Sequence, residues 1–132
     1  MRKNQTLLFI LPILLLVSAC RKTENVVIPN QTIYRNITAN MWTSSDNGKT
    51  YTADLDLSND IRFSSEVDGI LVYLSYSEGS YEQIPFTYDS TAFSYAVSGN
   101  ALRIDAQDPL ADVEIENPGP IFVKIVLIPS SE

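Results

Sequence analysis

The chain contains no histidine, and cysteine occurs only once, at Cys20. Without imidazole and with a single thiol, neither a Ser-His-Asp nor a Cys-His nucleophile system can form, and a zinc site built on those ligands is excluded. A lone cysteine also excludes a disulfide within the chain. No glycine-rich phosphate loop is present, which removes the usual nucleotide sites. We therefore expect no cofactor, no metal and no enzymatic activity, apart from chemistry that needs only carboxylates.

Long apolar runs are also scarce, and the most extended, Leu7–Val17, stands near the start of the chain behind Arg2 and Lys3. A basic start followed by a short apolar stretch is typical of a secretory signal, whereas a membrane-spanning helix needs about 20 apolar residues. The run ends in Val17-Ser18-Ala19-Cys20, which resembles the lipobox of bacterial lipoproteins. An uncleaved anchor helix and an ordinary signal peptide are the alternatives.

The lipobox resemblance implies that residues 1–19 are removed, that the Cys20 thiol receives diacylglycerol and that the new amino group is acylated. Several acyl chains hold a protein on a membrane, where one chain would not. Residues 20–30 then form the lipidated cysteine and a tether with a coil reach of roughly 17 Å, and residues 31–132 form one domain. By analogy with the sorting of Gram-negative lipoproteins, in which an aspartate after the cysteine causes retention at the inner membrane, Arg21 favours the outer membrane, on either face.

Basic residues are few as well, with nine Lys and Arg against 16 Asp and Glu. Removal of residues 1–19 takes away Arg2 and Lys3, which leaves seven basic residues and a net charge of −9. Such a charge repels nucleic acid and anionic lipid. Beside the membrane itself, the expected partners are therefore glycans or envelope proteins, and not nucleic acid.

Short apolar segments separated by turn residues fill the rest of the chain, and all five glycines lie between them. Alternating or continuous apolar residues predict about seven strands, around Ile33 and Ile37, over 51–58, 70–76, 83–88 and 92–98, around Leu102 and Ile104, and over 121–128. The sequence therefore predicts a single all-β domain, an antiparallel β-sandwich of the immunoglobulin-like kind.

Three connections of this sandwich are also predicted. Asp46-Asn47-Gly48-Lys49 reads as a hairpin turn between the first two strands. Ser58–Asp68 has room for one helical turn, and Asp105–Pro120 is expected to be an acidic connection that crosses between the sheets.

Aromatic side chains are the first candidates for ligand contact. Tyr73 and Tyr81 have a strand parity opposite to the predicted core, and Trp42 precedes the first turn, so all three are candidates for stacking on sugar rings. The alternative is core packing, the usual role of aromatic residues in strands.

One candidate modification site is also present. Asp89-Ser90-Thr91 resembles the O-glycosylation acceptor of Bacteroidetes-type bacteria, which makes Ser90 a candidate modification site.

Carboxylates are the second group of candidates. Asp54 and Asp56 stand two residues apart, so a strand would place them on one face at roughly 6.5 Å, a spacing that a glycosidase can use. The alternative is that Asp54 and Asp56 are the solvent-exposed half of an alternating strand.

A calcium loop starting at Asp54 is not supported, because Asn59 replaces the required glycine and Ser65 the required glutamate. A looser calcium site stays open among the acidic residues of the long connection: Asp105, Asp108, Asp112, Glu114 and Glu116.

The lipobox, Ile37–Trp42, Gly69–Leu74, Ile84–Tyr88 and Phe122–Ile128 together resemble short outer-membrane lipoproteins of Bacteroidetes-type bacteria. The resemblance implies the anchor and the fold but carries over no catalytic residue. Three hypotheses follow: a non-enzymatic, lipid-anchored module that binds glycan or protein or is structural, a carboxylate-dependent glycoside hydrolase, and an envelope assembly subunit. The last would use an exposed apolar face containing Leu71, Tyr73, Phe122 and Val126.

Overall fold

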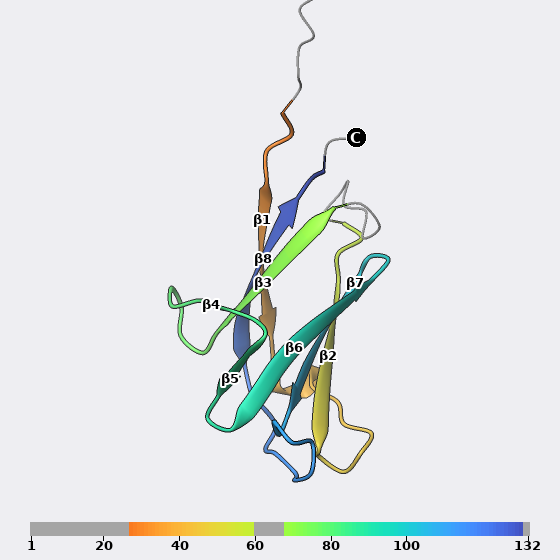
Figure 1. Cartoon of the computed structure of the whole chain (residues 1–132), viewed down its shortest axis with the longest axis vertical. Coiled ribbons are helices and arrows are strands. Elements are labelled where there is room, and N and C mark those ends of the chain that lie inside the picture. Colours follow the sequence, from red (N-terminus) through yellow and green to blue (C-terminus); the bar gives the residue numbers. More distant parts are fainter. Residues whose placement is uncertain (1–26, 60–67, 131–132) are drawn as a thin grey trace, which may run out of the picture.

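The computed structural model describes residues 27–59 and 68–130, which form eight strands and one three-residue 3₁₀ turn, Ala39–Met41 (Figure 1). The strands are β1 (Gln31–Ile37), β2 (Thr50–Asp56), β3 (Gly69–Ser75), β4 (Glu82–Gln83), β5 (Phe86–Tyr88), β6 (Thr91–Ser98), β7 (Ala101–Gln107) and β8 (Ile121–Ile128). The predicted all-β sandwich is confirmed. It has eight strands because the predicted strand over 83–88 is divided at Pro85, which has no N–H for a ladder.

Two four-stranded antiparallel sheets make up the sandwich. Sheet A has the order β1-β8-β3-β4, and sheet B has the order β2-β7-β6-β5. Strand β8 pairs with β1 on one side and with β3 on the other, each over seven residues, so the apolar segments 70–76 and 121–128 are neighbours inside sheet A. Both strands lie between two other strands of the sheet, the position that continuous apolar runs favour.

The core lies between the sheets and follows the alternation of the sequence. On β8, every second side chain from Ile121 to Leu127 is buried, and the residues between them are partly exposed. The buried apolar residues are Ile33, Ile37, Trp42, Ala53, Leu55, Leu57, Val72, Leu74, Ile84, Phe93, Leu102, Ile104, Ala106, Ile121, Val123, Ile125 and Leu127. Each sheet thus has an inner face in the core and an outer face toward solvent.

The predicted hairpin between the first two strands is wrong. Strand β1 pairs with β8 and β2 pairs with β7, so β1 and β2 lie in opposite sheets. The turn itself forms, with Asn47 and Gly48 both at positive φ, but it closes only an isolated bridge between Thr43 and Thr52. Gly69 also departs from its predicted turn, because it is the first residue of β3.

The two ends of the sandwich differ in what they carry. Strand β1 enters and β8 leaves at one end, and the opposite end carries the turns around residues 47 and 89 and the connection 108–120 (Figure 1). This connection crosses from sheet B to sheet A as predicted, but starts later because β7 continues to Gln107.

Some of the predictions fall on other parts of the chain. The predicted signal, Cys20 and most of the segment predicted to hold a helical turn lie outside the described residues. In the described ranges, no helix is long and apolar enough to cross a membrane.

Candidate functional site

Trp42 is a core residue, which corrects its prediction as a ligand contact. Its side chain is 5% exposed, and its Nε1 donates a hydrogen bond of 2.8 Å to the Gly119 carbonyl. A buried indole usually needs such a partner. Trp42 therefore joins the 3₁₀ turn after β1 to the long connection before β8, and its ring is not available to stack on a ligand.

Tyr73 and Tyr81 lie on the outer face of sheet A, as their parity predicted, but a lysine lies against both. Lys124 Nζ is 4.3 Å from the centre of the Tyr73 ring and 5.0 Å from that of Tyr81. Tyr34 lies on β1, beside Lys124 of β8. Its ring centre is 6.1 Å from that of Tyr81. The three tyrosines and Lys124 thus form one cluster, in which the ammonium occupies ring faces that a sugar would use.

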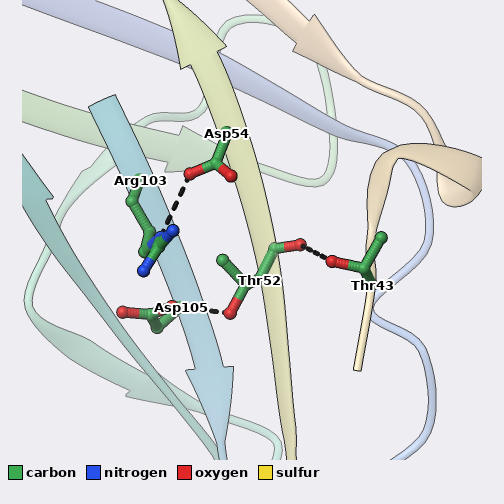
Figure 2. Close-up of polar contacts among 5 residues, drawn as sticks. All are labelled: Thr43, Thr52, Asp54, Arg103 and Asp105. Carbon is green, nitrogen blue, oxygen red and sulfur yellow. Dashed lines mark hydrogen bonds and ion pairs between the residues drawn. The ribbon is translucent and has the colours of Figure 1, made fainter. Parts of the chain in front are cut away.

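Asp54 and Asp56 lie on the outer face of sheet B and have other partners. Figure 2 shows Asp54 beside Arg103. The Arg103 Nε is 3.1 Å from the Asp54 Oδ1, and both side chains are more than half exposed. The backbone N–H of Ser58 donates to Asp56, which lowers the pKa of that carboxyl. A glycosidase needs one carboxyl with a raised pKa to protonate the leaving group. The Asp56 carboxyl, whose pKa is lowered, is therefore not suited to that role.

Figure 2 also shows that Asp105, a calcium candidate, accepts a hydrogen bond of 2.9 Å from the Thr52 hydroxyl. Asp108 accepts one from the Leu110 N–H in its own turn. No three acidic side chains in residues 27–59 and 68–130 come together in a way that could hold a metal ion. The described acidic residues of the connection therefore do not come together as the ligands of one metal ion.

Tyr76 and Tyr88 form an exposed aromatic pair that the sequence did not predict as a site. Their ring centres are 5.3 Å apart at 34°, and the side chains are 45% and 52% exposed. Tyr76 also packs edge-on against Phe93, 6.4 Å away and 1% exposed, so the pair is fixed to the core. Such support keeps the rings in place for a ligand.

Two surface hollows share Tyr76 and Tyr88 in their walls. One, of about 200 Å³, runs along the end of β3 toward Glu82 and Phe86. The other, of about 470 Å³, lies between the β5–β6 turn and the connection before β8. We call the two hollows with their shared tyrosines the aromatic groove. The β5–β6 turn and the connection 108–120, which line the larger hollow, lie at the end of the sandwich opposite to the start of β1 (Figure 1).

The electrostatics of the aromatic groove are uniformly acidic. Its larger hollow is lined by Asp89, Asp108, Glu114 and Glu116, and no described Lys or Arg lines either hollow. Burial, with smaller effects of Tyr88 and Asp89, raises the pKa of Tyr76 above its ordinary 10.0. The Tyr76 phenol therefore keeps its proton at neutral pH and can donate a hydrogen bond.

Ser90 borders the same groove. Asp89 and Ser90 both have positive φ in the two-residue turn between β5 and β6, and the Ser90 side chain is exposed. A two-residue hairpin loop of this kind needs positive φ at both positions. Glycosylation of Ser90 stays a prediction, and a glycan there would stand at the rim of the aromatic groove.

The sequence offered a weak signal for this groove. Tyr88 has the same strand parity as Ile84 and Phe86, which favours packing over ligand contact, and Tyr76 follows the last residue of β3. No protein-family model, curated protein or solved structure matches this chain.

Proposed function

We propose that this protein is a lipid-anchored module of the cell envelope, held at the outer membrane through Cys20, that binds a glycan without transforming it. One observation carries the binding proposal: Tyr76 and Tyr88 present exposed, supported rings between two open hollows. The anchor is supported by the Val17–Cys20 motif.

The chemistry of the aromatic groove favours a sugar as ligand. The C–H face of a pyranose can lie on a tyrosine ring, which is apolar on its faces and polar at its hydroxyl. Sugar hydroxyls would donate to the carboxylates of Asp89, Glu114 and Glu116 and to the side-chain oxygen of Asn117. A binding site with apolar walls and a few polar groups for orientation has this composition.

Charge restricts the class of glycan. Because acidic side chains line the larger hollow, sugars that carry carboxylate, sulfate or phosphate would be repelled. Neutral glycans and those with free amino groups remain. The position of the groove is also suitable, since β1 begins at the other end of the domain (Figure 1).

A panel of immobilised neutral, amino and acidic glycans tests the proposal. We expect the lipidated protein in detergent to bind members of the first two classes only. Tyr88→Ala should weaken binding roughly tenfold, the loss expected for an aromatic contact. Tyr34→Ala is the matched control, because it removes an exposed tyrosine from the outer face of sheet A. Equal loss in both variants, or no binding to any glycan, would contradict the proposal.

A further inference from the structure

The outer face of sheet A is unusually apolar and aromatic for a surface. Register places Leu71 beside Val126 and Tyr73 beside Lys124, all on the outer face, with Tyr34 on the other side of Lys124. The outward residues of β1, β8 and β3 are Thr32, Tyr34, Asn36, Phe122, Lys124, Val126, Ile128, Leu71 and Tyr73, whereas Ser75, at the end of β3, is buried. A face of this composition marks an interaction surface.

The charge of this face differs in sign from that of the chain. None of the outward residues described on β1, β8 and β3 is an aspartate or a glutamate, although the chain carries a net charge of −7. Lys124 is the one cation among them, and its ammonium lies over the rings of Tyr73 and Tyr81. Aliphatic side chains with tyrosines and a lysine match the headgroup layer of a bilayer, where tyrosine and lysine keep their polar ends in water.

The connection to the anchor brings this face close to a membrane. Sheet A contains β1, the first strand after the tether, and β1 begins at Gln31. The ten residues between Cys20 and Gln31 reach roughly 17 Å as a coil, which is less than the length of about 23 Å of a seven-residue strand. A tether this short keeps the domain at a high effective concentration near the bilayer, so a weak contact is enough to hold an orientation.

We propose that the outer face of sheet A rests on the phospholipid surface to which the protein is anchored. The Lys124 ammonium meets lipid phosphates, the tyrosines lie among the headgroups, and Leu71, Phe122 and Val126 face the boundary with the acyl chains. The polar outer face of sheet B then faces water, and the aromatic groove opens at the end of the domain. This orientation rests on the lipid anchor of the proposed function, but not on glycan binding.

Site-specific quenching in vesicles tests this orientation. The lipidated protein is reconstituted in phosphatidylcholine vesicles that contain a nitroxide-labelled lipid, with a fluorophore on Asn36→Cys or on Ser94→Cys. Both positions are exposed, the first on the outer face of sheet A and the second on that of sheet B. We expect quenching of the Asn36→Cys label to be several times that of the Ser94→Cys label.

A charge reversal at Lys124 gives a second test, in which the label stays at one position and the surface of the protein is changed. Lys124→Glu should reduce quenching of the Asn36→Cys label at least twofold, because a carboxylate would face the lipid phosphates. Lys49→Glu is the matched control, since Lys49 is an exposed lysine in the turn before β2. That turn lies at the end of the sandwich opposite to the start of β1 (Figure 1). Lys49→Glu should leave quenching unchanged.

Vesicle flotation separates failure of the orientation from failure of the anchor. If the protein floats with vesicles and Cys20→Ser does not, but the two labels are quenched equally, the orientation is wrong and the anchor stands. If the unaltered protein does not float, both are wrong. Energy transfer between labelled copies without lipid quenching would assign the face to a second copy of the chain and overturn the proposal.

Discussion

The two outer faces of this sandwich are built on the same scaffold and have opposite surfaces. At the centre of sheet A, Lys124 lies between Tyr34 and Tyr73, whereas at the centre of sheet B, Arg103 faces Asp54 across the ladder. The central outward residues of sheet B are all short or charged: Thr52, Asp54, Arg103, Asp105, Ser94 and Ala96. Because the core fixes only the inner faces, the outer faces are free to differ, and their difference reports what each side meets.

The largest effect is expected for a substitution on the inner face of sheet A. Its comparison with an outer-face substitution tests whether the stability of the fold depends on the inner face alone. Ile125 is 0% exposed, and its neighbour Val126 points outward from the same strand. Ile125→Ala should lower the free energy of unfolding by about 3 kcal/mol, because it leaves a cavity between the sheets. Val126→Ala should cost less than about 1 kcal/mol. Denaturant titrations of both variants measure the difference, and equal losses would show that the outer face of sheet A is also part of the stabilising core.

The sequence predicted the inner faces well, because burial of alternate residues is a local signal. Ile33 and Ile37 in β1, and Leu102 and Ile104 in β7, were placed in strands from this alternation and are buried. The pairing of strands was less accessible. Asp46–Lys49 has the residues of a hairpin turn, but whether β1 pairs with β2 or with β8 depends on contacts far apart in the sequence.

The candidate site was predicted less well, and for a physical reason. Tyr73 and Trp42 are both aromatic residues near strands, but one lies on an outer face and the other in the core. Parity identified Tyr73 because β3 is regular. It could not identify Tyr76 or Tyr88, since their exposure depends on how the β5–β6 turn and the connection 108–120 meet at the end of the sandwich.

A smaller effect is expected for the side-chain contact at the centre of each outer face. These contacts are Arg103 with Asp54 on sheet B and Lys124 with Tyr73 on sheet A. Arg103 and Asp54 are both more than half exposed, so a double-mutant cycle with alanine should give only a weak coupling. Lys124 and Tyr73 should give about 0.5–1 kcal/mol. Salt distinguishes the two, because screening weakens the exposed ion pair more than a contact whose lysine stem is packed on rings. Equal salt dependence of the couplings, measured by denaturation, would contradict this comparison.

The smallest expected effect is the loss of stability at acidic pH. It should arise from carboxylates on the outer face of sheet B, such as Asp56. The pKa of Asp56 is lowered from 3.8, chiefly because its carboxylate accepts the Ser58 N–H. A lowered pKa stabilises the fold above pH 3.8, and that contribution is lost as the pH falls through the folded-state value. Asp56→Asn keeps an acceptor for Ser58 but cannot titrate, so its unfolding free energy should fall less steeply between pH 5 and pH 3 than that of the unaltered chain. An unchanged slope would mean that the bond is not maintained in solution. The outward positions of β1, β8 and β3 hold no carboxylate in the structure, so Thr32→Asn should leave this slope as it is.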